Sequence, residues 1–79
     1  MKVEVQLFAT LAAYLPAGAS GDTVTLAVPN GTTATELVRS LGIPGDLECL
    51  MVVNGHDVSP GHRLTDGDVL SLFPPLAGG

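Results

Sequence analysis

The sequence predicts an α+β domain in which one main helix packs against a small mixed sheet. Residues 2–8 and 23–28 alternate apolar and polar side chains, as half-buried strands do. Residues 33–42 carry the end signals and the apolar spacing of a helix. Two further apolar runs, residues 50–53 and 69–73, return as strands after that helix. Strands on both sides of a single helix, in this order, predict a two-layer α+β fold.

The N-terminal strand is expected to bury one of its faces. Val3, Val5 and Leu7 share one face, and the polar residues between them share the other. The next segment, residues 9–15, is rich in alanine and leucine and predicts a short helix or an irregular apolar turn. Pro16 ends this segment, and a loop with two glycines leads to the second strand.

The main helix is expected to begin after the second strand, whose buried face is predicted to carry Val24, Leu26 and Val28. Thr33 and Glu36 have the spacing of a capping box, in which the two residues satisfy amides of the first turn. Gly42 stands where a helix commonly ends in a left-handed glycine, and Pro44 prevents continuation. The apolar face is formed by Ala34, Leu37, Val38 and Leu41.

The C-terminal half predicts the remaining strands. The apolar run Leu50–Val53 is too short for a helix, so we expect a buried strand that ends in a tight turn at Asn54-Gly55. Residues 56–65 are polar and are expected to be irregular, with one short strand near Leu64. A second turn, at Asp66-Gly67-Asp68, precedes the final strand. The whole order describes a roll of the β-grasp type with four or five strands.

Composition restricts the classes of function. A hydrophobic fraction of 46% with 14% charged residues indicates one folded domain, not disorder. The net charge of −5 disfavours nucleic-acid binding, which needs clustered cations, and favours a basic protein partner or simple solubility. The single cysteine, Cys49, excludes an internal disulfide. The chain contains no run of the roughly 20 apolar residues that are needed to span a membrane. We therefore expect a soluble, cytoplasmic protein.

The last residues form a separate segment. Residues 1–73 are expected to make the domain, and residues 74–79 an extended tail ending in Gly-Gly. Prolines favour an extended path, and glycines let the walls of a partner close on the backbone. Such a tail spans at most about 20 Å at roughly 3.3–3.6 Å per residue. The pattern predicts a tail that enters a narrow site, with Gly79 as the group attacked and, as its approach, Pro74, Pro75, Leu76, Ala77 and Gly78.

Four segments of the chain match the pattern of one known family. They are Val3 to Ala9, Val53-Asn54-Gly55, Leu64 with Asp66-Gly67-Asp68-Val69, and Phe73 to Gly79. Together they resemble the ubiquitin-like sulfur carriers, a family that includes the small subunit of molybdopterin synthase and the sulfur carrier of thiamine biosynthesis. The resemblance covers essentially the whole chain, and the diproline before the tail is most similar to the molybdopterin branch.

The resemblance implies a role as a carrier that is not itself a catalyst. An E1-like activating enzyme would use ATP to adenylate Gly79, and sulfur from a persulfide would then replace AMP to give a thiocarboxylate. The large subunit of molybdopterin synthase would receive that sulfur for the pterin, in a heterotetramer. Three alternative functions remain. The chain could carry sulfur for thiamine or for a sulfur amino acid. It could be a protein modifier that is joined to lysines through Gly79, or an interaction module with an inert tail.

Other side chains are candidates for contacts with a partner. Phe73 and Phe8 are expected on the wet face of the sheet as a docking surface, whereas Leu70 and Leu72 are expected in the core. Cys49 has acidic neighbours that oppose a thiolate, so we interpret it as structural. His56 and His62 lack the further ligands that a zinc site needs, and no bound cofactor or metal is expected.

Overall fold

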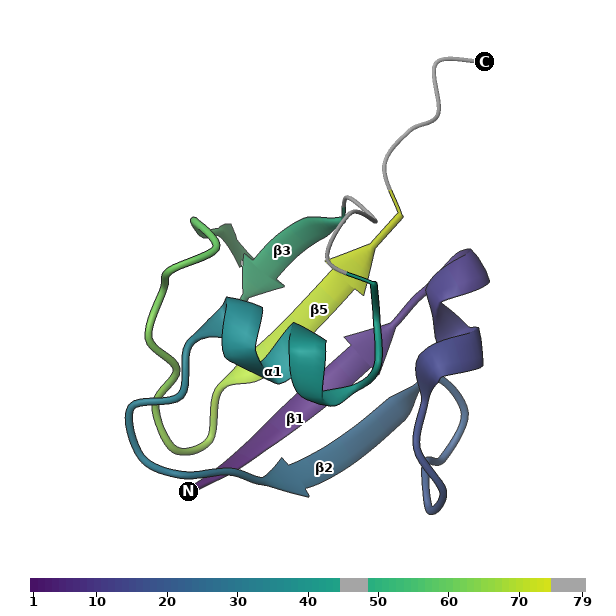
Figure 1. Cartoon of the computed structure of the whole chain (residues 1–79), viewed down its shortest axis with the longest axis horizontal. Helices are drawn as coiled ribbons and strands as arrows, with labels where there is room; N and C mark the ends of the chain where they lie inside the picture. The colour runs from purple at the N-terminus through teal and green to yellow at the C-terminus, as the bar shows by residue number, and fades with distance from the viewer. Residues whose placement is uncertain (45–48, 75–79) are drawn as a thin grey trace.

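The structure is a computed structural model that describes residues 1–44 and 49–74, and it contains a five-stranded mixed sheet with one main helix (Figure 1). The predicted α+β roll of the β-grasp type is confirmed. The elements, in chain order, are β1 (Lys2–Leu7), the 3-10 helix η1 (Ala9–Tyr14), β2 (Thr23–Ala27), α1 (Ala34–Ser40), β3 (Leu50–Val53), β4 (His56–Asp57) and β5 (Val69–Phe73).

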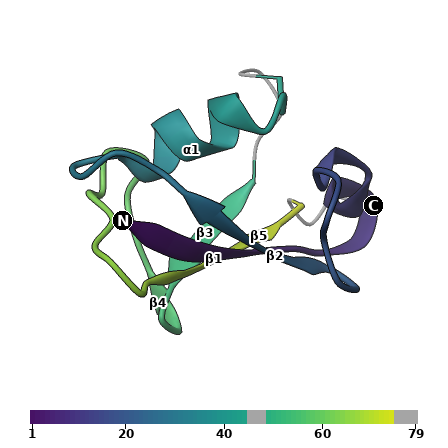
Figure 2. The same cartoon turned by 90° about the horizontal axis from the view of Figure 1, so that it is seen from below.

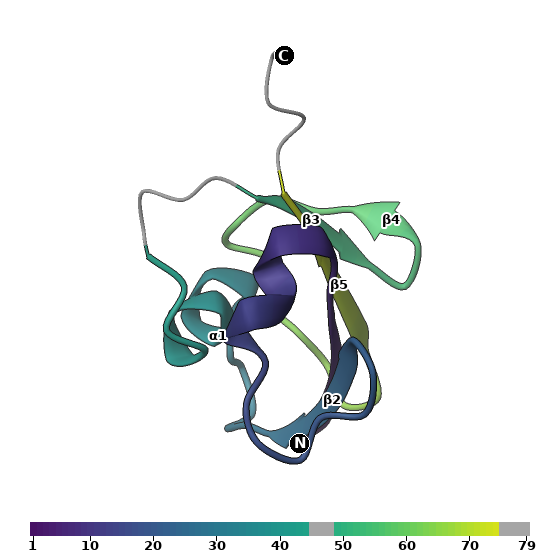
Figure 3. The ribbon, with the colours of Figure 1, turned by 90° about the vertical axis from the view of Figure 1, so that its right-hand side faces the viewer.

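The strands lie in the order β2-β1-β5-β3-β4. β1 is antiparallel to β2 and parallel to β5, so the first and last strands form the centre of the sheet. β3 is antiparallel to both β5 and β4. Parallel neighbours need a crossover connection, and α1 lies within it, on one face of the sheet. The opposite face carries no helix from the described part of the chain (Figures 2 and 3).

The core lies between α1 and the two central strands. Val5 pairs with Leu70 and Leu7 pairs with Leu72, and all four side chains are fully buried. Leu37 covers them from α1 and is also buried. Burying a side chain of this size contributes about 1.5–3 kcal/mol relative to leaving it in water. The predicted alternation of β1 and the predicted core positions in β5 are therefore confirmed.

The capping signals of α1 are also confirmed. The Thr33 hydroxyl accepts from the Glu36 amide at 3.2 Å, and the Glu36 carboxylate accepts from the Thr33 amide at 2.9 Å. Gly42 follows the last turn with a φ of 85°, the left-handed conformation that glycine adopts without strain. The described helix thus begins and ends at residues that the sequence marks.

Two predictions for the C-terminal half are wrong. The short strand expected near Leu64 is instead β4, at His56–Asp57, because the turn at Asn54-Gly55 folds these residues back onto β3. Near Leu64 there is only an isolated bridge. The strand at residues 50–53 exists, but it is not buried throughout. Leu50 is 53% exposed, because alternate residues of β3 point away from α1.

Candidate functional site

The uncovered face of the sheet carries an apolar patch. On this face the register places Phe73 of β5 beside Leu50 of β3, and Val52 two residues further along β3 beside Ser71. Phe8 follows β1 with the same parity as the outward-facing residues of that strand. We call Phe8, Leu50, Val52 and Phe73 the outer patch. The patch is formed by β3, β5 and the residue that directly follows β1, so it depends on how the strands pair.

The two aromatic rings of the outer patch are stacked on each other. The ring centroids of Phe8 and Phe73 are 4.7 Å apart and the ring planes differ by 6°. The Phe8 amide donates to the carbonyl of Leu72 at 3.2 Å, so the chain continues beside β5 after β1 ends. Stacked aromatic pairs contribute about 0.5–1.5 kcal/mol beyond the area that they bury. The stack thereby gives the half-buried rings a fixed position on the face.

Sequence reasoning missed the β3 half of this patch. Leu50 and Val52 belong to a run without polar residues, which hides the alternation between the two faces. Only the pairing of Leu50 with Phe73 reveals that Leu50 faces away from the core. The sequence does predict Phe73 on the wet face, and the residue that pairs with Phe73 must lie on the same face. The sequence does not show that this residue is Leu50, because it does not give the register of β3 against β5.

The tail begins at the outer patch. β5 ends at Phe73, and Pro74 follows directly. Pro75, Leu76, Ala77, Gly78 and Gly79 lie outside the described residues, so their predicted role in threading and sulfur chemistry stays a prediction. A partner that covers the patch would lie immediately beside the point where the chain leaves the domain.

A buried carboxylate holds the start of β5 in place. Asp68 accepts from the Thr65 amide at 2.8 Å, from the Thr65 hydroxyl at 2.9 Å and from the Asn54 side chain at 3.0 Å. Asn54 in turn accepts from the Val69 amide at 3.0 Å. Burial alone would raise the pKa of Asp68, but these hydrogen bonds, together with the nearby His62, lower its pKa below the usual value. The carboxylate is therefore a structural anchor between two turns.

The remaining candidates offer no catalytic arrangement in the described residues. Burial raises the pKa of the Cys49 thiol, which keeps it protonated and a poor nucleophile. Within residues 1–44 and 49–74, no three histidine, cysteine or acidic side chains come together as metal ligands. The helices of this part of the chain are all too short or too polar to cross a bilayer.

Comparisons with known proteins agree with this architecture. The chain is similar to SAMP1 from Haloferax volcanii, with 29% identity, complete coverage of both chains and a TM-score of 0.74. It is similar to a protein assigned as subunit 1 of molybdopterin converting factor from Pyrococcus furiosus, with 27% identity over 95% of this chain and 98% of that one and a TM-score of 0.70.

A third similar structure is a complex. It contains subunits 1 and 2 of molybdopterin-converting factor from Helicobacter pylori 26695, and the matched chain has 27% identity, complete coverage of both chains and a TM-score of 0.61. A comparison with curated protein sequences gives no significant match. The sequence model of the ThiS family matches residues 5–79, which include the Gly-Gly end. The chain therefore belongs to the ThiS family of small β-grasp proteins, which act as sulfur carriers or as ubiquitin-like modifiers.

Proposed function

We propose that this chain is the sulfur-carrying subunit of a molybdopterin synthase and that Gly79 is its reactive residue. The observation that carries the proposal is the family match, which runs through the last residue and so includes the tail itself. Similarity to a protein described as subunit 1 of molybdopterin converting factor, and to a chain in a complex of subunits 1 and 2 of that factor, favours the pterin branch over thiamine or amino-acid synthesis.

The chemistry requires a cycle of activation and transfer at one carbon atom. The Gly79 carboxylate attacks the α-phosphorus of ATP on an E1-like enzyme, and pyrophosphate leaves. A persulfide sulfur then attacks the acyl carbon and AMP leaves, which forms an acyl disulfide. A thiol reduces that disulfide and releases the thiocarboxylate. After the sulfur has passed to the pterin precursor, water restores the carboxylate. The chain itself binds no cofactor in this scheme.

The outer patch is the surface that we assign to docking. Leu50 is 53% exposed beside the Phe8–Phe73 stack, and the patch adjoins Pro74, where the tail begins. A large apolar side chain in water favours association, because burying it against a partner releases that surface from water. The large subunit and the activating enzyme both need the same tail. We therefore infer that they use this patch in turn and compete for it.

The test is sulfur transfer with defined components. The thiocarboxylated chain is mixed with the large subunit of a molybdopterin synthase and with a pterin precursor, and dithiolene formation is followed. The expected result is product in proportion to the charged carrier, and none from the chain that ends at Gly78. Transfer to a thiazole precursor with its own synthase, and not to the pterin, would move the protein to the thiamine branch.

A second function is favoured by one specific comparison. A further Haloferax volcanii structure with 28% identity and a TM-score of 0.73 is described as small archaeal modifier protein 1. In that function Gly79 would form an isopeptide bond with a lysine of another protein. Digestion of cell extracts would then leave Gly-Gly remnants on lysines, in amounts that depend on this chain. Their absence from a strain that makes active carrier would exclude conjugation under those conditions.

A further inference from the structure

The outer edge of β2 has open backbone hydrogen-bonding groups. Met1 and Val28 exchange two hydrogen bonds of 2.8 Å, and the Leu7 amide donates to Asp22 at 2.9 Å. In an antiparallel pair, bonded and non-bonded positions alternate, so Val24 and Leu26 also point their backbone groups at β1. The residues between them, Thr23, Thr25 and Ala27, therefore point theirs outwards.

Only part of that edge is used within the chain. Thr23 exchanges backbone hydrogen bonds with Ser20, at 2.8 and 3.1 Å, which closes one end of the edge. No partner for the outward groups of Thr25 and Ala27 is found in the described part of the chain. Open strand edges of this kind are templates for pairing with another strand.

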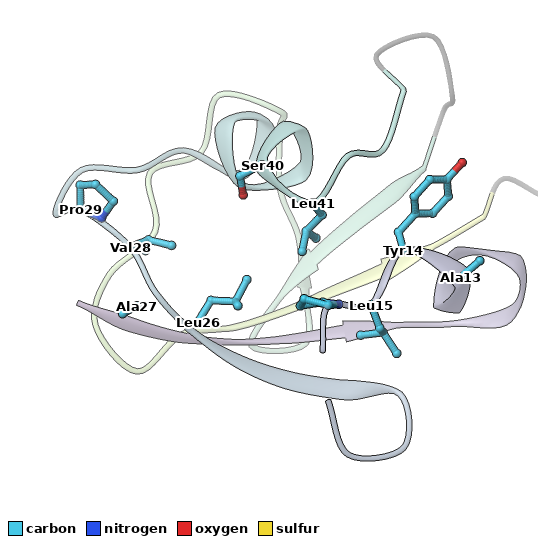
Figure 4. A pocket seen from close by; sticks show the side chains of 10 residues that line it. Ala13, Tyr14, Leu15, Leu26, Ala27, Val28, Pro29, Ser40 and Leu41 are labelled. Carbon is cyan, nitrogen blue, oxygen red and sulfur yellow. The ribbon is translucent and has the colours of Figure 1, made fainter. Parts of the chain in front are cut away.

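An apolar groove runs along the same edge, on the face that carries α1. It has a volume of about 600 Å³, within the range of pockets that hold ligands in proteins. Figure 4 shows Leu26 pointing from β2 towards α1 and Leu41 pointing from the end of α1 back towards the sheet. Both side chains are only partly buried. The groove is completed by Tyr14, Leu15, Val28 and Ser40.

We infer that this edge and groove together bind an extended segment of another protein, which adds a strand to β2. A strand paired with Thr25 and Ala27 would place every second side chain on the α1 face, directly over the groove. Backbone hydrogen bonds would hold the segment, and large apolar side chains at alternate positions would fill the groove. One occupant thus satisfies two separate features of the surface. The site lies away from the outer patch, which is on the other face of the sheet.

Charge decides what kind of segment fits. A second copy of this chain would bring another net charge of −5 to the edge, so self-association is disfavoured. Asp22 lies at the start of β2, and Glu36 shares a stripe of α1 with Ser40, which lines the groove. The N-terminal ammonium of Met1 donates a hydrogen bond to the Val28 carbonyl, so a positive charge lies at the other end of the strand. The segment we assign is therefore apolar in alternation and basic where it passes Asp22.

The remaining cations do not alter this assignment. Arg39 lies on the stripe of α1 that includes Thr35, whose hydroxyl donates to Pro60 at 2.7 Å on the far side of the helix. Lys2 pairs with Ala27 and is exposed with the outward-facing residues of β1. Arg63 forms an isolated bridge with Thr33, just before α1. None of these three cations lines the groove.

The first experiment uses a synthetic peptide and the full isotope-labelled chain. The peptide has about ten residues, a usual strand length, alternates isoleucine with threonine and carries lysines at one end. We expect amide shifts at Thr25, Leu26, Ala27 and Leu41, and slower hydrogen exchange at the amides of Thr25 and Ala27. Changes confined to the outer patch would overturn the inference. So would the same shifts on adding unlabelled chain, because the edge would then serve self-association.

The second experiment tests the backbone hydrogen bonds. Thr25→Pro removes an outward amide and leaves the β1 ladder intact, a place where an edge strand tolerates proline. We expect about tenfold weaker peptide binding, whereas Thr25→Val keeps the amide and should keep the affinity. If Thr25→Pro does not fold, a peptide N-methylated at the amides that face β2 makes the same test on the natural chain. Undiminished binding of that peptide would overturn the strand addition.

The third experiment tests the groove. Ser40→Lys places a long cation over the groove at a helix end that favours positive charge, so the fold should be unaffected. It should weaken the basic peptide about tenfold, whereas Arg39→Gln on the other flank should not. Equal effects of the two variants on peptide affinity would contradict binding of the peptide in the groove. Deleting Gly79 should leave peptide binding unchanged, so this inference and the sulfur-carrier proposal can fail separately.

Discussion

Asp68 stabilises the local structure by joining two turns through hydrogen bonds to its carboxylate. Its carboxylate receives three hydrogen bonds, from Thr65 and Asn54, and only 7% of the residue is exposed. Removing a charged acceptor leaves these donors without a partner, which costs more than the bonds themselves contribute. The residue therefore links the turn after β3 to the start of the strand that leads into the tail.

Asp68→Asn should destabilise the fold by about 1–3 kcal/mol, because an amide cannot accept all three hydrogen bonds that the carboxylate accepts. Urea unfolding measures the loss. Asp57→Asn is the matched control, since Asp57 is exposed on β4, and its effect should stay within about 0.5 kcal/mol. If both variants lose the same free energy of unfolding, the buried hydrogen bonds of Asp68 do not stabilise the fold.

The same carboxylate predicts a pH dependence of stability. The pKa of Asp68 is lower in the folded chain than its usual value, so the folded state favours the ionised form. Its contribution is fully present above the unfolded pKa of about 3.9 and is lost as the pH falls through the lower, folded pKa. The stability difference between the natural chain and Asp68→Asn should hold from neutral pH to about pH 5 and shrink below about pH 4. A difference that grows in acid would contradict this sign.

Leu50 tests the outer patch at a single position. Leu50→Lys should leave the free energy of unfolding within about 0.5 kcal/mol, because the side chain is half in water already. Binding of the large subunit should weaken at least about tenfold, as expected when an apolar anchor in an interface is lost. Isothermal titration measures both this variant and the control Asn30→Lys, at an exposed position in the turn that follows β2. Equal binding by the two variants would remove Leu50 from the docking surface.

Phe73 both packs against Phe8 and belongs to the outer patch. Truncating its side chain shows whether the ring contributes more to folding or to partner binding. Phe73→Ala removes the stack on Phe8 and part of the patch. We expect partner binding to suffer more than folding, because the ring is only half-buried and its main neighbour is another surface ring. Chemical denaturation and binding titrations give the two losses. A loss of stability as large as the loss of binding energy would place Phe73 in the core.

At the scale of elements, α1 depends on its cap, since seven residues make too few turns for a stable isolated helix. Thr33→Ala should lower stability by about 1 kcal/mol, because the Glu36 amide loses its acceptor. Thr33→Ser keeps the hydroxyl and should lose much less. Thermal unfolding followed by circular dichroism compares the variants. If Thr33→Ser loses as much as Thr33→Ala, the stabilising group is the methyl and not the cap.

The regular elements could be predicted from sequence because their signals are local. The alternation of β1 and the capping box of α1 each involve residues that lie only a few positions apart along the chain. β4 could not be predicted, since two residues give no periodic pattern and become a strand only by pairing with β3. The exposure of Leu50 and the ring stack likewise depend on register between distant segments. Phe8 and Phe73 meet only because β1 and β5 are parallel neighbours.

At the scale of the whole molecule, the two faces and the edge of one sheet have different surfaces. α1 and the core cover one face, and the outer patch lies on the other, at the end where Pro74 follows β5. The open edge at Thr25 and Ala27 is separate from both. A carrier needs a surface that positions its end in the site of a partner. The place of the patch beside the start of the tail is what such a surface requires.

If Gly79 carries sulfur, loading the chain with sulfur must change the mass of the intact protein. The chain is incubated with its activating enzyme, ATP and a persulfide donor, and the chain without Gly79 serves as the control. We predict a gain equal to the exchange of one oxygen for one sulfur, located on the C-terminal residue and absent from the control. An unchanged mass, or the same gain in the control, would contradict the claim.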